Sequence, residues 1–351
     1  MQPTPTASPA AAPDADAPIL SVRGLKTYFM LDEGVVRAVD GVGFDVYAGR
    51  TLGIVGESGC GKSITARSIL GIVDRPGRIE AGEIWLRQVG ADGQAIRTDL
   101  AALPPEGPAM RAVRGRQIAL IFQEPMASLS HFYTVGNQII ESIRQHQLAG
   151  KRGARERAIE LLRMVGVPRP ERRVDEYPFQ LSGGLRQRVM MAMALACDPV
   201  VLIADEPTTA LDVTTQAQVL DLLRDMQRRR GLAVILITHD MGVIAEMADD
   251  VVVMYLGLAV EKGPVDEIFH APKHPYTRAL LRSIPSVLAE PRTKLATLSG
   301  SIPHPFARPG GCPFHPRCPD AMPGLCDVAE PPPLTLGERR EVSCFLYGGK
   351  P

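Results

Sequence analysis

The sequence predicts an α/β fold, in which a mostly parallel sheet is covered by helices, interrupted by a helical subdomain and followed by a small cysteine-containing module. Three short apolar runs carry this prediction, at residues 51–55, 200–204 and 233–238. Strands that are buried on both faces have this composition, which is typical of parallel sheets. Each run leads into glycine or polar residues, and ligands of such sheets bind beyond the carboxyl ends of the strands.

The chain divides into three expected segments. Residues 1–18 are mostly Pro, Ala, Thr, Ser and Asp, without a basic start or an apolar block, so a disordered tail is expected rather than a signal peptide. Residues 19–270 are expected to form the main domain, with the helical subdomain at about residues 124–190. From residue 271 to 351 prolines become dense and cysteines cluster, which predicts a separate C-terminal extension.

Composition narrows the class of protein. The 39 lysines and arginines balance 39 aspartates and glutamates, so no bulk field attracts nucleic acid or an anionic membrane surface. The longest apolar run, residues 251–260, is roughly half of the ~20 residues that span a bilayer. Six cysteines without an export signal indicate a reducing compartment. We therefore expect a cytoplasmic chain without a membrane span.

A phosphate-binding loop is predicted directly after the first apolar run, where the pattern G-x-x-x-x-G-K-[ST] precedes an expected helix from Ser63 to Leu70. The nucleotide-binding residues predicted here are Gly56, Glu57, Ser58, Gly59, Cys60, Gly61, Lys62, Ser63 and Ile64. Backbone amides at such a helix N-terminus surround phosphates. Lys62 would bind the β- and γ-phosphates of ATP and assist catalysis, and Ser63 would bind Mg²⁺. The alternative is a glycine-rich turn with a chance lysine.

An acidic pair, Asp205 and Glu206, ends the second apolar run. A phosphate-loop ATPase needs one acid to hold Mg²⁺, directly or through water, and one carboxylate to activate the attacking water. We assign the first role to Asp205 and the second to Glu206. Alone, such a pair is most often a solvated turn, so its meaning depends on the phosphate loop.

Residues 181–188 read Leu-Ser-Gly-Gly-Leu-Arg-Gln-Arg. With this segment, the sequence resembles the ABC ATPase family, whose signature is LSGGQ. The resemblance implies a P-loop NTPase fold with an ABC-type ATPase core. Ser182 can cap the following helix, and with Gly183 and Gly184 it would form a second anion site. In the family this site closes over ATP bound to a partner, which implies a head-to-tail dimer. Leu185 replaces the glutamine of the general signature.

The resemblance also implies roles for isolated residues in the order of the family. Gln123 would bind Mg²⁺ or the attacking water, His239 would bind the γ-phosphate as a catalytic residue, and Asp212 would lie at the dimer interface. Phe29 would stack on adenine, with Tyr28 as the competing candidate. Each has a plainer interpretation as a core aromatic, a surface amide or a satisfied histidine.

Closer resemblance, at residues 185–195, 204–212 and 274–281, is to the dipeptide and oligopeptide importer branch, specifically its first ATPase subunit. This implies two membrane permeases, a paralogous second ATPase, an extracytoplasmic substrate-binding protein and a place on the cytoplasmic face of the inner membrane. Relatives in the branch move nickel, glutathione or oligosaccharides, so the cargo rests on resemblance alone. The rival class is a non-transport ABC ATPase, but those usually carry two cassettes or a coiled-coil insertion.

Four cysteines lie in the proline-rich extension with the spacing C-x5-C-x7-C-x17-C: Cys312, Cys318, Cys326 and Cys344. The segment has few apolar positions for a core, and a metal centre would explain how it orders. Four thiolates suit an iron–sulfur cluster, or zinc with His315 as an added ligand, and unligated thiols are the third interpretation. Similar cysteine sets in the importer branch are associated with a [4Fe-4S] cluster, which is the interpretation we prefer.

Overall fold

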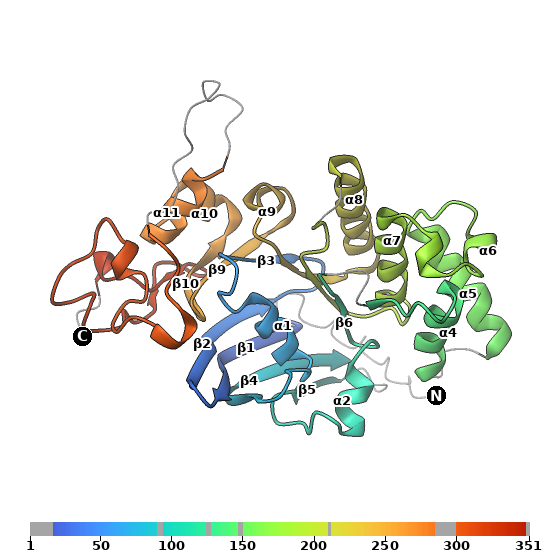
Figure 1. Cartoon of the computed structure of the whole chain (residues 1–351), viewed down its shortest axis with the longest axis horizontal. Coiled ribbons are helices and arrows are strands. Elements are labelled where there is room, and N and C mark those ends of the chain that lie inside the picture. Colours follow the sequence, from blue (N-terminus) through green and yellow to red (C-terminus); the bar gives the residue numbers. More distant parts are fainter. Residues whose placement is uncertain are drawn as a thin grey trace, which may run out of the picture.

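The computed structural model describes residues 17–89, 94–123, 128–146, 150–209, 212–284 and 300–348. Nearly all of the expected tail, residues 1–16, and the first residues of the expected helical subdomain, 124–127, lie outside these ranges. The described part forms a wide molecule, with the C-terminal extension at one end and a group of helices at the other (Figure 1).

A central eight-stranded sheet runs through the molecule in the order β11-β12-β10-β9-β3-β8-β7-β6 (Figure 1). Its parallel strands are β3 (Thr51–Val55), β6 (Ile118–Ile121), β7 (Val201–Asp205), β8 (Ala233–Ile237) and β9 (Asp250–Tyr255). Every residue of β3, β7 and β8 is buried, which confirms the prediction of strands covered on both faces.

Two hydrophobic cores lie on opposite faces of this sheet. In β8, Val234 and Leu236 enter one core, while Ile235 and Ile237 enter the other. Successive side chains of a strand point to opposite faces, so each apolar run serves both cores. Helix α1 (Lys62–Ile69) packs in the second core, against strands of both sheets.

A second, antiparallel sheet lies beneath α1, in the order β2-β1-β4-β5 (Figure 1). Its strands are β1 (Leu20–Leu31), β2 (Gly34–Val46), β4 (Gly77–Val89) and β5 (Ala95–Asp99). The short helix α2 (Pro108–Val113) follows it. The sequence analysis did not predict this sheet. It places β2 beside the phosphate loop, where the strand forms one wall of the cavity described below.

The helical subdomain lies at the end of the molecule opposite the C-terminus (Figure 1). Its helices are α4 (Val135–Gln145), α5 (Lys151–Met164), α6 (Pro170–Arg173), η1 (Pro178–Gln180) and α7 (Gly183–Ala194). The Thr134 hydroxyl caps α4 by accepting from the Asn137 amide at 3.3 Å. On α4, Ile139 and Ile143 are fully buried and Ile140 is partly buried, which gives this helix one apolar side toward the core. Two further helices, α8 (Val213–Arg230) and α9 (Met241–Met247), cover the main sheet.

The C-terminal extension continues the central sheet. The elements from the sheet edge onward are β10 (Leu258–Pro264), α10 (Val265–His270), α11 (Pro275–Arg282), η2 (Pro305–Ala307), η3 (His315–Arg317), β11 (Leu334–Thr335), β12 (Glu341–Val342) and η4 (Phe345–Tyr347). Strand β12 pairs antiparallel with β10, which itself pairs antiparallel with β9. The extension is thus joined to the core by backbone hydrogen bonds.

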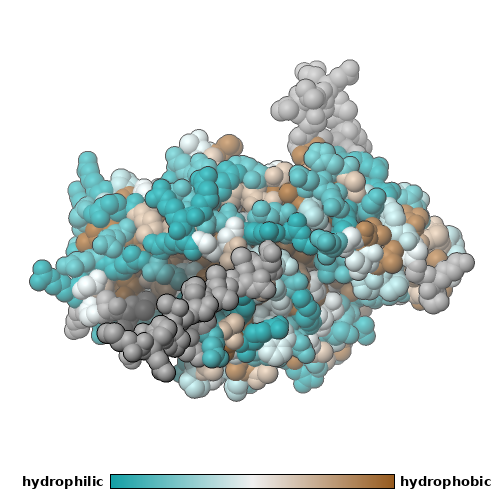
Figure 2. Space-filling view, turned by 180° about the vertical axis from the view of Figure 1, so that it is seen from behind, coloured by the Kyte–Doolittle hydropathy of each residue, from teal (hydrophilic) through white to brown (hydrophobic). Residues whose placement is uncertain are grey.

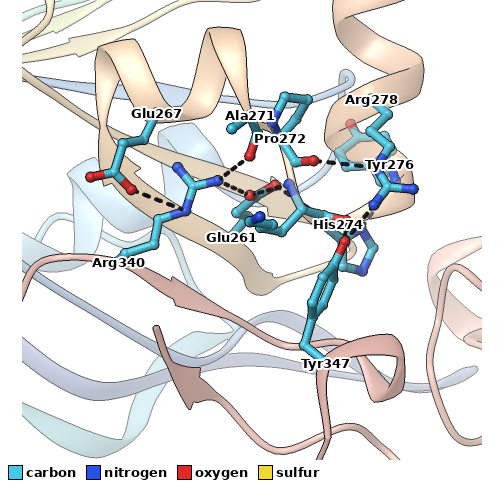
Figure 3. Close-up of polar contacts among 10 residues, drawn as sticks. Glu261, Glu267, Ala271, Pro272, His274, Tyr276, Arg278, Arg340 and Tyr347 are labelled. Carbon is cyan, nitrogen blue, oxygen red and sulfur yellow. Dashed lines mark hydrogen bonds and ion pairs between the residues drawn. The ribbon is translucent and has the colours of Figure 1, made fainter. Parts of the chain in front are cut away.

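A buried polar network fixes this junction (Figure 3). The Arg340 guanidinium donates to the Glu261 carboxylate and to the Ala271 carbonyl. The same carboxylate accepts from the backbone amides of Lys273 and His274 at 2.7 and 3.0 Å. Burial lowers the pKa of His274 to about 3, so its ring is neutral and accepts the Tyr276 amide at 3.0 Å. The buried Arg340–Glu261 ion pair and its hydrogen bonds therefore hold the extension in one position against β10.

The surface is largely polar. Figure 2 shows hydrophilic residues over most of the face seen from behind, with hydrophobic residues in small scattered groups. Within the described ranges, no helix combines the length and the apolar composition that a membrane crossing requires.

Candidate active site

The phosphate loop connects the end of β3 to the start of α1. Gly56 has a φ of 153° and Gly61 a φ of 104°, in the region that favours glycine. A Cβ on Gly61 would lie 2.2 Å from the Ala38 carbonyl oxygen, and one on Gly56 would lie 2.2 Å from the Met254 carbonyl oxygen. Both positions therefore need glycine for backbone conformation and for close approach of neighbouring strands.

A cavity of about 350 Å³ opens in front of the loop. It is lined by Val36, Arg37, Ala38, Ser58, Gly59, Gly61, Lys62, Ser63, Ile64, Gln123, Glu206, Leu256, Gly257, Pro305 and Arg308. Six of the predicted loop residues are in this lining, but Gly56, Glu57 and Cys60 are not. The structure therefore brings the loop, Gln123 and Glu206 to one cavity, from three separate parts of the chain.

Lys62 lies at the base of the cavity with 6% of its surface exposed. Its ammonium donates to the Gly56 carbonyl at 2.8 Å and to the Glu57 carbonyl at 3.1 Å. A buried ammonium is costly without such partners. The lysine is held by its own loop in a place from which it can reach a phosphate.

Asp205 has a buried carboxylate with one oxygen that lacks a partner among the described residues, as expected of a residue that binds Mg²⁺. The side chain is buried at the end of β7, and burial raises its pKa, against the opposing effect of a hydrogen bond from Ser63. Its Oδ1 atom is buried and has no hydrogen-bond partner among the described residues. A hard divalent cation binds oxygen ligands of this kind. Asp205 and Ser63 are thus arranged as the predicted metal-binding pair.

Glu206 receives hydrogen bonds from three directions. Its carboxylate accepts from Gln123 Nε2 at 2.9 Å and from the Thr209 hydroxyl at 2.9 Å, and it lies 3.2 Å from His239 Nδ1. Burial opposes its ionisation, but the contacts with Thr209 and His239 and the charge of Lys62 outweigh burial, so the pKa of Glu206 is lowered. The carboxylate is therefore ionised at neutral pH, as a general base must be.

The serine of residues 181–188 caps α7 as predicted. The Ser182 hydroxyl accepts from the Leu185 amide at 3.4 Å, and a Cβ on Gly183 would meet nothing within 4 Å. Neither these residues nor Gly184 line the cavity of their own chain. Asp212 caps α8 by accepting from the Thr215 amide at 2.9 Å. Both helix starts therefore lie outside the cavity that their own phosphate loop lines.

Neither aromatic candidate for the adenine contact lines the cavity. Phe29 lies against Gly77, where an added Cβ would be 2.6 Å from the Phe29 ring. Tyr28 points to the other side of β1 and donates to Asp40 at 2.6 Å, and burial together with Asp40 raises the pKa of Tyr28 to about 12. The adenine role of Phe29 therefore stays a prediction.

Sequence reasoning missed the part of the lining that comes from the C-terminal extension. Pro305 and Arg308 close one side of the cavity, and Arg308 Nη1 lies 2.8 Å from Asp40 Oδ2 in β2. Arg308 and Asp40 are 268 residues apart, so no local sequence motif could have predicted their contact. The extension is therefore part of the site as well as an appendage to it.

The four cysteines of the extension are partly buried and lie near one another. Burial raises the pKa of Cys312 to about 11, and the thiols of Cys326, Cys344 and Cys318 add to the effect. Among the described residues, no three His, Cys, Asp or Glu side chains are grouped as ligands of a single metal ion. The described residues thus show no formed metal site for either interpretation, the preferred [4Fe-4S] cluster or zinc with His315.

A phosphate loop, a buried acid beside Ser63 and an ionised carboxylate at the carboxyl edge of parallel strands are the features of a phosphate-loop ATPase. Two family models match this chain. The model described as ABC transporter matches residues 39–209, and the model described as oligopeptide/dipeptide transporter, C-terminal region, matches residues 260–326.

Relatives match almost the whole chain. The dipeptide transport ATP-binding protein DppD of Haemophilus influenzae is 47% identical over 326 residues, covering 93% of this chain and 94% of its own length. The oligopeptide transport ATP-binding protein AppD of Bacillus subtilis is 48% identical over 330 residues, covering 94% and 97%. This chain therefore belongs to the ABC transporter ATPase family, in the branch of the dipeptide and oligopeptide transport ATP-binding proteins.

Solved structures agree on the fold of the main domain. The dimeric bacterial ABC transporter cassette MJ0796 superposes with a TM-score of 0.60 at 25% identity, covering 70% of this chain and 98% of the cassette. The cbiO1 protein of Clostridium perfringens, part of the ABC transporter complex cbiONQ, gives a TM-score of 0.58 at 26% identity, covering 72% and 91%. The predicted ABC-type ATPase fold is confirmed.

Proposed function

We propose that this chain hydrolyses ATP to drive import of dipeptides and oligopeptides through separate membrane permeases. The observation that carries the ATPase part is the Glu206 carboxylate, held ionised at the cavity that Lys62 and Ser63 line. The peptide cargo is supported by the names of relatives that match over 94% and 97% of their length, and by the oligopeptide/dipeptide transporter C-terminal region that matches residues 260–326. The permeases and an extracytoplasmic binding protein complete the transporter.

The residues divide the chemistry of hydrolysis among them. Lys62 binds the β- and γ-phosphates, while Ser63, Asp205 and Gln123 would hold Mg²⁺, which supplies positive charge that offsets the charge of the phosphates. Glu206 accepts a proton from the attacking water. His239, beside Glu206, contacts the γ-phosphate and keeps the carboxylate in place.

A second ATPase subunit completes each site in this proposal. Ser182, Gly183 and Gly184 at the start of α7 contact the triphosphate bound to the partner, and Asp212 lies at the same interface. Support comes from the exposed positions of Ser182, Gly183 and Asp212, and from the place of all four residues outside the cavity of their own phosphate loop. The partner is a paralogous chain, so the working unit is a heterodimer with two composite sites. ATP closes this pair and hydrolysis reopens it.

An uptake assay in the native host tests both the ATPase assignment and the peptide cargo. Replacing the chromosomal gene with a Lys62→Ala version should abolish uptake of a labelled dipeptide, and wild type on a plasmid should restore it. Labelled nickel, glutathione and an oligosaccharide are the comparison cargoes. Loss of uptake of one of these, with dipeptide uptake intact, would reject the peptide assignment while leaving the ATPase assignment in place.

The place of the chain in the cell follows from its partners. It binds the permeases peripherally, on the cytoplasmic face of the inner membrane. In cell fractions the chain should sediment with the membrane when the permeases are present and stay in the supernatant when they are deleted. Membrane association that persists without the permeases would contradict this placement.

The cysteine cluster completes the proposal. Cys312, Cys318, Cys326 and Cys344 would hold a [4Fe-4S] cluster, which would bridge segments of the extension that have few apolar contacts of their own. Support comes from four partly buried cysteines: burial raises the pKa of the Cys312, Cys318 and Cys344 thiols, and neighbouring cysteines of the set add to each shift. Protein purified without air should contain about four iron and four labile sulfide per chain. Absence of both would reject the cluster, and zinc in their place would favour the other metal.

A further inference from the structure

Glu57, the second residue of the phosphate loop, is bound by the C-terminal extension. Its carboxylate lies 2.7 Å from Arg317 Nη1 through Oε2 and 3.0 Å from Nη2 through Oε1. This is the bidentate geometry of a strong, directional ion pair. The Arg317 side chain is 4% exposed and lies 260 residues further along the chain. The pair therefore joins the loop to the segment between Cys312 and Cys318.

The backbone of Glu57 is held as well. Its amide donates to the Tyr276 hydroxyl at 2.9 Å, and its carbonyl accepts from the Lys62 ammonium at 3.1 Å. The extension thus contacts the side chain and the amide of the residue whose carbonyl holds the phosphate-binding lysine. A displacement of Glu57 would move the partner of Lys62.

An aromatic cluster makes this contact rigid. Tyr255, Tyr276 and Phe314 lie with ring centroids 4.7 to 5.4 Å apart, and the Arg317 guanidinium stands 5.9 Å from the centre of the Tyr255 ring. Tyr276 and Phe314 are at most 1% exposed. Rings at these distances pack favourably and have little freedom. The packed rings therefore hold the Arg317 guanidinium in place beside the phosphate loop.

The consequence for the nucleotide is electrostatic. Glu57 places a negative charge on the loop that must bind a triphosphate, and an unpaired carboxylate there repels phosphate and attracts Lys62. The guanidinium neutralises that charge and turns the carboxylate away from the cavity, whose lining excludes Glu57. No part of the loop motif predicts this partner, since it comes from the far end of the chain.

We propose that Arg317 is a positioning residue for ATP binding and hydrolysis, which holds the phosphate loop in its binding conformation through Glu57. The C-terminal extension thereby acts on the ATPase site of its own chain. This inference rests on the ATPase assignment and is independent of the transported cargo.

Calorimetric titration of the full chain with Mg-ATP tests it, in a Glu206→Gln background that prevents turnover. Arg317→Met should weaken binding by about tenfold or more, because an uncompensated charge is felt strongly at a site of low effective dielectric. Arg317→Lys keeps the charge but loses the bidentate geometry, so its affinity should fall between those of Arg317→Met and the Arg317 parent.

Arg340→Met is the matched control. It removes a buried arginine of the same extension from its own carboxylate, Glu261 (Figure 3), and among the described residues neither of these two side chains hydrogen-bonds the phosphate loop directly. Both variants should melt at lower temperature, but Arg340→Met should bind Mg-ATP within about threefold of the parent. Equal weakening of affinity in the two variants would mean that Arg317 acts only through general stability, which overturns the proposal.

The double variant Glu57→Gln/Arg317→Met gives the decisive comparison. Removing the unpaired charge should restore affinity to within about threefold of the parent, although the ion pair is still absent. Failure of the double variant to recover affinity would overturn the proposal. Lys62→Ala, titrated in parallel, should not bind; normal binding by that variant would instead place the nucleotide elsewhere and reject the active site itself.

Steady-state hydrolysis by the assembled transporter gives a second measurement, with Glu206 intact. Arg317→Met should raise KM for ATP about tenfold, and Arg317→Lys should raise it less. If Arg317→Met fails to fold, Arg317→Lys alone and with Glu57→Gln carries the same comparison. Unchanged KM in Arg317→Lys and no effect of Glu57→Gln would overturn the proposal.

Discussion

Gln123 and His239 reach the Glu206 carboxylate from two different strand ends, and the Gln123 amide donates to Oε2 at 2.9 Å while His239 Nδ1 lies 3.2 Å from Oε1. Each carboxylate oxygen thus has a separate partner. These contacts fix the orientation of the carboxylate. A base that is oriented in advance loses little freedom when the reaction begins.

Glu206→Gln should bind Mg-ATP but hydrolyse it at least about 100-fold more slowly, because the amide cannot accept the proton of the attacking water. The variant should accumulate a closed, ATP-bound pair of subunits. ATPase assays and size-exclusion chromatography with Mg-ATP check both outcomes. Near-normal turnover would remove Glu206 from the role of base.

The acid limb of the pH–rate profile should depend on Thr209. In the wild type the pKa of Glu206 is below its ordinary value, so activity that needs the ionised carboxylate is retained above that pKa and lost as the pH falls through it. Thr209→Val removes a 2.9 Å hydrogen bond that stabilises the charged form of Glu206. Because burial favours the neutral form, the pKa of Glu206 should rise in the variant. The fall in kcat/KM should therefore begin at higher pH in the variant. A superimposable acid limb would contradict this cause.

Asp205→Asn should separate metal binding from stability. The variant should need about tenfold more Mg²⁺ for half-maximal hydrolysis, since it lacks one anionic ligand. The folded state raises the pKa of Asp205, so ionised Asp205 costs stability at neutral pH when no metal is bound. Without Mg²⁺ the variant should melt no lower than wild type. A marked loss of melting temperature would show that Asp205 has a structural role that the geometry does not include.

Gly183→Asp should abolish hydrolysis without unfolding the chain. The added side chain enters open space, so the melting temperature should be close to that of wild type. Its negative charge would stand where the partner's triphosphate docks, and like charges repel. ATP binding to the isolated chain should be retained while turnover in the assembled pair is lost. Retained turnover would place the start of α7 outside the composite site.

Arg340→Met should lower the free energy of unfolding by about 3 kcal/mol, because it leaves the buried Glu261 carboxylate without its counter-charge. Adding Glu261→Gln should recover part of the loss. Urea denaturation followed by circular dichroism provides the measurement. Additive losses in the double variant would show that the two side chains are not energetically coupled.

The local motifs were predictable because their residues are adjacent in the sequence. The phosphate loop needs one strand end, one turn and one helix start, all between residues 51 and 69, and the structure has this order. The Ser182 cap is also local, since its acceptor and donor are three residues apart. The fold class followed from fully apolar strands, whose pattern differs from that of half-buried strands.

The missed features depend on contacts between distant segments. The antiparallel sheet of β1 and β2 has an irregular burial pattern with register shifts, so its alternation is weak in the sequence. Phe29 shares a face of β1 with Thr27, whose hydroxyl lies 2.8 Å from Ser68 in α1, and neither Phe29 nor Thr27 lines the cavity. The partners of Glu57 and Asp40, Arg317 and Arg308, come from beyond residue 300 and have no motif.

The pairing of β12 with β10 has a consequence for any shortened form of the protein. Strand β10 would become the outermost strand if the chain ended after α10, and its main-chain donors and acceptors would be left open to solvent along one side. An exposed edge strand of this kind can pair with strands of other molecules, which leads to aggregation. A truncated cassette should therefore aggregate more readily than the full chain, because strand β12 protects part of this edge.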